Sequence, residues 1–225
     1  MCPWCYIGKR RMEEALRQLP FNTVVSRLWH PFQLNSDMPR QGLDRKAYRS
    51  KKFGSWEQSQ AMDAQVTAAG KTVGIEFRYD LQTHTPNTFD SHRLVWLAGA
   101  SGVQDAVVEA LFRAYFCEGA NFSNQTKLIE VGASAGMDAV ELKRFFASEA
   151  GASAVREEEQ RARILGISGV PFYVINESVS FSGAQPAETF LDALRRTKMP
   201  DKKPADAGLS GAAQVCGPDG CEVPR

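Results

Sequence analysis

The first eight residues constrain this chain more than any other stretch, because they place Cys2 and Cys5 on either side of Pro3 and Trp4. The spacing lets the two sulfurs close a small ring if the segment forms the first turn of a helix. Unpaired N–H groups and the dipole at a helix N-terminus stabilise a thiolate on Cys2, and Pro3 suits this position because its missing N–H would be unpaired there. The motif favours a dithiol–disulfide redox centre; half of a zinc site and two unrelated reduced thiols are the alternatives.

A second informative stretch, residues 166–175, lies far downstream and contains Gly169-Val170-Pro171-Phe172. A proline that opens an apolar, β-rich run is typical of the start of a strand. We therefore expect strands at 172–175 and 179–182, joined by a three-residue hairpin turn.

Together these two stretches resemble the thioredoxin fold and, more narrowly, the DsbA-like family. Further segments resemble its FrnE-like, 2-hydroxychromene-2-carboxylate isomerase-related branch: Pro31-Phe32-Gln33-Leu34-Asn35, Asn87-Thr88, His92-Arg93-Leu94, residues 111–116 and Ser182-Gly183-Ala184-Gln185-Pro186. The resemblance extends from residue 1 to about Thr197. It implies an α/β protein with a thioredoxin-like fold of the DsbA type and a large, all-helical insertion.

The hydrophobic pattern supports this organisation of the chain. Residues 1–35 form the expected first thioredoxin half, with a helix from Cys5 to Leu19 and a strand from Val24 to Trp29. Residues 36–152 read as the helical insertion, in which Ser55 and Asp138 are expected helix caps. Residues 153–198 form the second half, and residues 199–225 a flexible, Lys-, Pro- and Gly-rich tail.

The beginning of the chain departs from the family pattern, in which a β-strand runs into the cysteine motif. Only Met1 precedes Cys2, so the first β-strand is apparently missing. A sheet without this central strand would leave two neighbouring strands with unpaired backbone groups, at a cost that few small domains absorb. We therefore expect that the true start lies upstream or is misassigned.

Disulfide exchange requires one thiolate that attacks and a second thiol that resolves the mixed disulfide. We assign attack to Cys2, expected at the exposed end of the motif, and resolution to Cys5, one turn into the helix. Pro3 and Trp4 lie between the sulfurs and are expected to tune the redox potential.

Other residues are assigned to the site through the resemblance. It implies that Pro171 is the family's cis-proline beside the active disulfide, with the Val170 backbone free to pair with an extended substrate. Tyr6 and Phe32 are candidates for the groove beside Cys2, although as core aromatics they need no function. His92 is a weaker candidate for a cleft residue, and none of the three histidines has metal-ligand spacing.

Cys216 and Cys221 form a second close pair, joined by a Pro-Asp-Gly turn signal. As a secondary dithiol on a flexible arm, they could exchange with Cys2 and Cys5, as the resemblance to FrnE-like proteins suggests. They could also complete a four-thiolate zinc site with the first pair, or act as a local staple. Cys117 is expected to be a buried, inert thiol.

A basic cluster at 45–52, comprising Arg45, Lys46, Arg49, Lys51 and Lys52, could bind an anion. We expect instead the more ordinary alternative, a solvated helical face. The net charge of +1 suggests no nucleic-acid partner, no apolar run is long enough to span a membrane, and no signal peptide precedes Cys2. We therefore expect a cytoplasmic protein.

The sequence predicts a protein thiol–disulfide oxidoreductase that acts on protein or small-thiol disulfides and needs no cofactor beyond its redox-active disulfide. The alternative is a glutathione-dependent isomerase or transferase of the 2-hydroxychromene-2-carboxylate isomerase type. Those relatives carry a serine at the position of Cys2, so the two cysteines here favour redox chemistry. A homodimer is a possible assembly, and no metal is expected.

Overall fold

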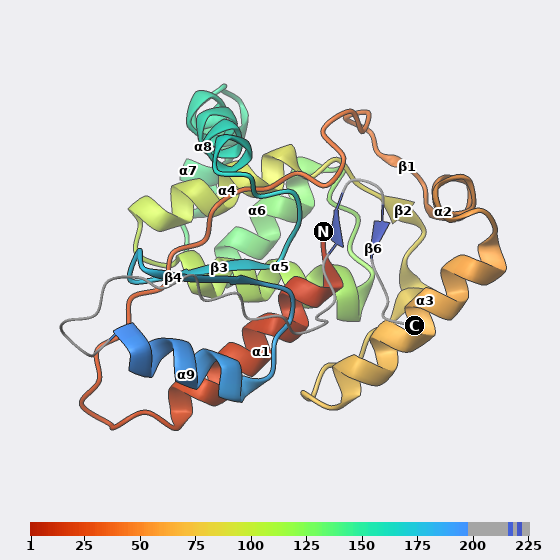
Figure 1. Cartoon of the computed structure of the whole chain (residues 1–225). Coiled ribbons are helices and arrows are strands. Elements are labelled where there is room, and N and C mark those ends of the chain that lie inside the picture. The colour runs from red at the N-terminus through yellow and green to blue at the C-terminus, as the bar shows by residue number, and fades with distance from the viewer. Residues whose placement is uncertain (198–215, 218–219, 222–225) are drawn as a thin grey trace.

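The computed structural model describes residues 1–197, 216–217 and 220–221. Helix α1 (Pro3–Arg17) opens the described chain, with Cys2 as its N-cap residue. Helix α9 (Ala187–Thr197) lies beside α1 (Figure 1). A small core of Ala15, Phe181, Phe190, Leu191 and Ala193 fills the space between these helices and the adjacent hairpin. Two segments that are remote in sequence thus form one layered unit.

The hairpin of β3 (Phe172–Ile175) and β4 (Val179–Ser182) confirms the two predicted strands. Ile175 pairs with Val179, and the strands run antiparallel. Asn176 and Glu177, the central residues of the turn, both have positive φ angles, 48° and 55°. Such turns match the right-handed twist of the flanking strands, so the turn helps to set the register in which Ile175 pairs with Val179.

The insertion consists mainly of helices that bury one face each, and some of them have a polar side chain that caps the first turn. Ser55 accepts the Gln58 N–H at 3.1 Å, and Asp138 accepts the N–H groups of Val140 and Glu141, each at 2.8 Å. The helices are α2 (Arg45–Phe53), α3 (Trp56–Lys71), α4 (Phe89–Ala100), α5 (Gln104–Glu118), α6 (Gln125–Ser134) and α7 (Ala139–Phe146), with the 3₁₀ turn η1 (Tyr79–Leu81) between α3 and α4. Helix α8 (Ala152–Ile164) follows α7, in the region predicted as the second thioredoxin half.

The insertion is not all-helical, and the prediction was wrong in this detail. Strands β1 (Leu43–Asp44) and β2 (His84–Thr85) form a short antiparallel pair. The Arg45 N–H donates to the Thr83 carbonyl at 2.9 Å, which continues the pairing into the start of α2. The pair thereby fixes the first turn of α2, whose Asp44 cap accepts the Ala47 N–H at 2.8 Å.

The predicted strand from Val24 to Trp29 is not formed in the described chain, which is a second correction. The Trp29 N–H donates to Gln104 Oε1 at 2.9 Å, and Gln104 Nε2 donates to the Trp29 carbonyl at 3.0 Å. A side chain of α5 therefore satisfies the backbone groups that a strand neighbour would have paired. Val24 and Leu28 remain largely exposed.

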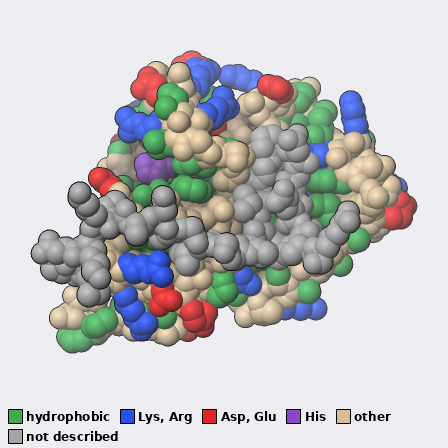
Figure 2. All heavy atoms as spheres, in the orientation of Figure 1, with side chains coloured by type: hydrophobic (Ala, Val, Ile, Leu, Met, Phe, Trp, Pro, Cys, Tyr) green, Lys and Arg blue, Asp and Glu red, His purple; other side chains and the backbone are tan. Residues whose placement is uncertain are grey.

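Most of the larger apolar core lies within the insertion, and Trp4, Tyr6 and Ile7 of α1 extend it. The Tyr6 ring stacks on Phe112 at 5.2 Å, while Phe77 and Phe116 complete the aromatic cluster. None of the helices in the described part of the chain combines the length and apolar character that a bilayer crossing requires. Positive and negative side chains are interspersed over the coloured part of the face in Figure 2.

Beyond Thr197, only β5 (Cys216–Gly217) and β6 (Gly220–Cys221) are described, and they pair with each other. The register places Cys216 directly opposite Cys221. The predicted flexible linker lies outside the described residues, as do the side chains of these two cysteines.

Candidate active site

The Cys-Pro-Trp-Cys segment forms the first turn of α1. Cys2 has extended backbone angles (φ −111°, ψ 120°), and its carbonyl accepts the Cys5 N–H at 3.2 Å. Pro3 occupies the first helical position, where no N–H is required. Cys2 and Cys5 are both free thiols in this structure, which corresponds to the reduced form of the pair.

The two thiols have opposite acidities. Burial acts to raise the pKa of Cys2, but hydrogen bonds from the Cys5 thiol and from the backbone N–H groups of Cys5 and Trp4 outweigh it, so this pKa falls below its ordinary value. The pKa of Cys5 is raised well above its usual range, first by its hydrogen bond to Cys2 and then by burial. Cys2 is therefore the more acidic thiol of the pair and Cys5 the less acidic one, the order that exchange requires.

Cys2 is not the exposed member of the pair, contrary to our expectation. It is 4% exposed, whereas Cys5 is half-buried. The physical reason is the loop before β3: Cys2 Sγ lies 3.6 Å from the Val170 carbonyl oxygen.

Pro171 follows directly, and the Val170–Pro171 peptide bond is cis. A Cβ atom placed on Gly8 would lie 3.5 Å from Pro171 Cγ, so this proline packs against the second turn of α1. The fold thus brings together the two motifs that the sequence singled out, although 168 residues separate Cys2 from Val170.

Tyr173 belongs to this site, and the sequence analysis did not single it out. Burial raises its pKa well above the usual range, and the nearby sulfurs of Cys5 and Cys2 add to the shift. Tyr173 and Pro171 both pack against Gly8 of α1. The position of Tyr173 two residues after Pro171 was the available signal for a phenol beside the cysteines.

Tyr6 does not line a groove, because its side chain is buried in a charged network. Its hydroxyl donates to Glu109 Oε1 at 2.8 Å and accepts a hydrogen bond from Arg10 at 3.0 Å. Lys9, 2% exposed, contacts Glu109 at 2.8 Å in the same network. Tyr6 therefore holds α1 on α5 rather than contacting a substrate.

Phe32 is half-buried, and its backbone contacts the ring of His92. Burial lowers the pKa of His92 to about 4; a nearby positive amino group contributes, and the hydrogen bond with Phe32 opposes the shift. The imidazole is therefore neutral at neutral pH. His92, the weaker candidate for a cleft residue, is thus kept neutral by burial.

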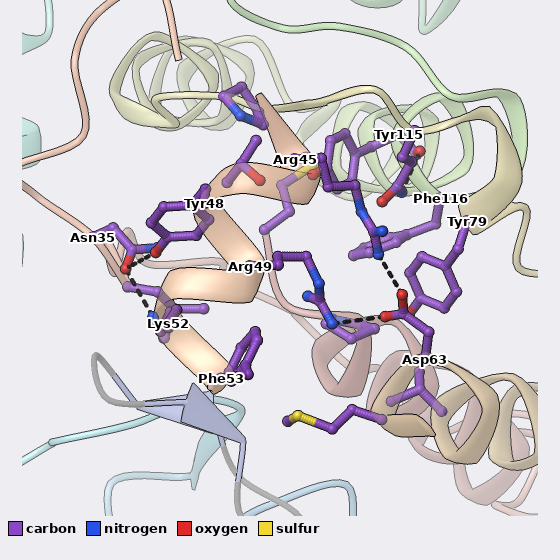
Figure 3. Close-up of a pocket in the computed structure, with 18 of the residues that line it drawn as sticks. Asn35, Arg45, Tyr48, Arg49, Lys52, Phe53, Asp63, Tyr79, Tyr115 and Phe116 are labelled. Atoms are coloured by element: carbon purple, nitrogen blue, oxygen red, sulfur yellow. Dashed lines mark hydrogen bonds and ion pairs between the residues drawn. The ribbon is translucent and has the colours of Figure 1, made fainter. Parts of the chain in front are cut away.

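A pocket opens beside the motif, with Pro3 and Trp4 in its wall. The basic cluster of α2 contributes Arg45, Arg49 and Lys52 to the same pocket (Figure 3). The expected solvated face is therefore wrong for these residues: Arg45 is 3% exposed. Packing of α2 on α3 turns this part of the cluster inward, which the helix alone could not show.

Comparison with protein families shows that the chain belongs to the DSBA-like thioredoxin domain family, whose model matches residues 1–195. The crystal structure of a probable DsbA oxidoreductase from Streptomyces coelicolor is 35% identical, with a TM-score of 0.81 over 100% of this chain and 95% of the other. A 2-hydroxychromene-2-carboxylate isomerase has 15% identity and a TM-score of 0.65 over 87% of this chain and 91% of its own, and so shares the fold. Comparison with curated proteins gives no match.

Proposed function

We propose that this protein is a thiol–disulfide oxidoreductase in which Cys2 attacks and Cys5 resolves. The observation that carries the proposal is the placement of both thiols in the first turn of α1, with Cys2 Sγ 3.6 Å from the Val170 carbonyl oxygen. The lowered pKa of Cys2 and the raised pKa of Cys5 agree with it. Membership of the DSBA-like family supports oxidoreductase or isomerase chemistry in general. The presence of both Cys2 and Cys5 narrows the proposed chemistry to thiol–disulfide exchange.

In the reductive direction, the Cys2 thiolate attacks one sulfur of a substrate disulfide. A mixed disulfide forms, and the second substrate sulfur leaves as a thiolate that takes up a proton. Cys5 then loses its proton and attacks the Cys2 sulfur, which releases the first substrate sulfur. The substrate gains two electrons and the protein becomes the Cys2–Cys5 disulfide; oxidation of a dithiol follows the same steps in reverse.

The loop before β3 is the proposed substrate platform. Because the Val170 carbonyl lies 3.6 Å from Cys2 Sγ, a segment extended along Val170 would carry its cysteine to the attacking sulfur. Protein and small-molecule disulfides both satisfy this requirement. Pro3 and Trp4, the residues between the sulfurs, are proposed to tune the redox potential of the pair.

Insulin reduction with and without Cys2 tests the proposal. Cys2→Ser is expected to lose all exchange activity, and Cys5→Ser to accumulate mixed disulfides with the substrate. Cys117→Ser is the matched control, since Cys117 is a half-buried thiol on α5 whose pKa is raised, mainly by burial. Wild-type activity in Cys2→Ser would overturn the assignment of the attacking group.

The same variants separate exchange from the alternative, glutathione-dependent isomerisation. An isomerase that uses one side chain at position 2 to orient glutathione has no need for a resolving thiol. Cys5→Ser would then keep its activity with a small isomerisable substrate. Loss of turnover in Cys5→Ser, together with trapped mixed disulfide, supports the redox proposal.

A further inference from the structure

Among the described residues that line the pocket beside Pro3 and Trp4, cationic side chains outnumber carboxylates. Its described lining includes three cations, Arg45, Arg49 and Lys52, and one carboxylate, Asp63. The three cations follow one another at spacings of four and three residues, so they share a face of α2. Figure 3 shows Arg45 and Arg49 extending from α2 toward Asp63 on α3.

Asp63 cannot neutralise this cluster by itself. Arg45 donates to Asp63 Oδ2 at 2.6 Å and Arg49 to Oδ1 at 2.8 Å, so one carboxylate serves two guanidinium groups. Burial lowers the pKa of Arg49, and the charge of Arg45 adds to this effect, while Asp63 opposes it. Buried cations of this kind are stabilised by an additional anion.

The cations are also held in fixed positions. The Arg45 guanidinium lies 5.2 Å from the centre of the Tyr79 ring, and the Arg49 guanidinium lies 4.8 Å from that of Phe53. Lys52 Nζ donates to Asn35 Oδ1 at 2.9 Å. Aromatic contacts and hydrogen bonds of this kind restrict the side chains before any ligand arrives.

Two polar groups of the lining have no hydrogen-bond partner among the residues that the structure describes. These buried groups are the indole Nε1 of Trp4 and the hydroxyl of Tyr79. An indole N–H can only donate, and burial raises the pKa of Tyr79 so that its hydroxyl stays protonated. An unpaired buried donor costs about 1–3 kcal/mol, so a ligand that supplies acceptor oxygens would remove this cost.

Met1 and Pro3, the residues on either side of Cys2, line the pocket together with Trp4. A substrate joined to Cys2 through a mixed disulfide would therefore lie beside the pocket wall. We propose that this pocket binds a carboxylate carried by the disulfide substrate, so that the protein exchanges preferentially with acidic disulfides. This proposal rests on the proposed oxidoreductase function and specifies its substrate class.

Matched disulfides test the preference. The rate constant of the reduced protein is measured with 3,3′-dithiodipropionate, which carries two carboxylates, and with the neutral bis(2-hydroxyethyl) disulfide. The ratio of the first rate constant to the second is then divided by the same ratio measured for dithiothreitol, which gives the normalised ratio. We expect the normalised ratio to favour the dianion by about tenfold, the effect of one charge-assisted hydrogen bond. Peptide disulfides with Glu or Gln beside the cysteine show whether the carboxylate of a peptide is recognised as well as that of a small molecule.

Substitutions locate the effect. Arg49→Gln with Lys52→Gln is expected to bring the normalised ratio close to one, while exchange with the neutral disulfide is retained. The matched control is Arg113→Gln, because Arg113 is an exposed residue of α5, outside the pocket, that pairs with Glu118 at 2.9 Å. A normalised ratio of one in the wild-type protein, or an unchanged preference in the double variant, would overturn the proposal.

Binding measured without exchange separates the pocket from the redox function. Adipate has two carboxylates and no sulfur, and we expect it to shift the ¹H–¹⁵N NMR signal of the Trp4 indole in the wild-type protein. A Trp4 shift in a protein that exchanges with no disulfide would refute the oxidoreductase and preserve the carboxylate site. Active exchange with neither a Trp4 shift nor a charge preference would refute the pocket proposal alone.

Discussion

The hydroxyl of Tyr173 occupies the space that a side chain at Gly8 would need: a Cβ atom there would lie 2.1 Å from Tyr173 Oη. The Tyr173 ring cannot easily move aside, because it packs against Phe181 at 5.2 Å and Phe190 at 4.8 Å. The absence of a side chain at position 8 therefore allows the strand that follows Pro171 to rest on α1, one turn beyond Cys5.

Gly8→Ala is accordingly expected to lower the free energy of unfolding by about 1–3 kcal/mol, as overpacking does. Alanine favours a helix by about 1 kcal/mol over glycine, so any loss reports the clash. Tyr173→Phe removes the hydroxyl and leaves Cζ at 3.3 Å as the nearest atom of that ring. In that background Gly8→Ala should be close to neutral in urea unfolding, and an equal loss in both backgrounds would contradict the packing argument.

The buried Lys9 network gives a second stability prediction. Lys9 binds Glu13 and contacts Glu109 at 2.8 Å and Asp105 at 3.6 Å. Lys9→Met would leave these carboxylates without their central cation, and we expect a loss of about 3 kcal/mol in urea unfolding. Adding Glu109→Gln should recover part of it.

The control for this variant is Lys127→Met, which removes an exposed partner of Glu130 on α6. Exposed ion pairs contribute about 0–1 kcal/mol, so this change should have little effect. Equal losses at Lys9 and Lys127 would show that burial of the ammonium group has no special importance.

Local signals in the sequence predicted much of the fold. Ser55 and Asp138 cap the helices that they were expected to begin, and the hairpin after Pro171 has the predicted strands. These features depend on residues that are close in the sequence, so they can be predicted from the sequence pattern. The cysteine motif at a helix N-terminus is of the same kind.

The remaining features depend on partners from distant segments. The sequence predicted a solvated Arg45, but Asp63 of α3 binds it in the structure. It also suggested that Tyr6 lines a groove, but the Tyr6 hydroxyl donates to Glu109 of α5. Alternation from Val24 to Trp29 predicted a strand, but a strand also needs a hydrogen-bonded neighbour, and the side chain of Gln104 takes that place at Trp29. Hydrophobic periodicity predicts which face of a helix or strand is apolar, but it does not identify the distant segment that packs on that face.

The acidity of Cys2 gives a prediction about reactivity. Because the Cys5 thiol hydrogen bond contributes to lowering the pKa of Cys2, Cys5→Ala should raise that pKa toward its ordinary value. The measurement is the pH dependence of Cys2 alkylation by iodoacetamide, followed by mass spectrometry of the peptide that contains it. Wild-type alkylation should stay fast at lower pH than in Cys5→Ala; superimposed profiles would contradict the assigned hydrogen bond.

His92 gives a pH dependence of stability. Its folded pKa of about 4 lies below the ordinary value of 6.5, so between these values the unfolded chain binds more protons. The stabilising contribution is complete above pH 6.5 and is lost as the pH falls toward 4, by up to about 1.4 kcal/mol per pH unit. His92→Gln should flatten the unfolding free energy across this window, and parallel curves for the two proteins would contradict a buried neutral imidazole.

The last prediction concerns the second cysteine pair. The β5–β6 register places Cys216 opposite Cys221, and directly opposed residues have Cα atoms about 4.5–5.5 Å apart, within the range that a disulfide spans. We expect these two cysteines to form a disulfide with each other under oxidising conditions and to exchange with Cys2 and Cys5. Cys216→Ser with Cys221→Ser should slow reoxidation of the Cys2–Cys5 dithiol by an external disulfide, while insulin reduction driven by dithiothreitol continues. Unchanged reoxidation would reduce the pair to a local staple, whereas loss of bound zinc from the variant would favour a four-thiolate site.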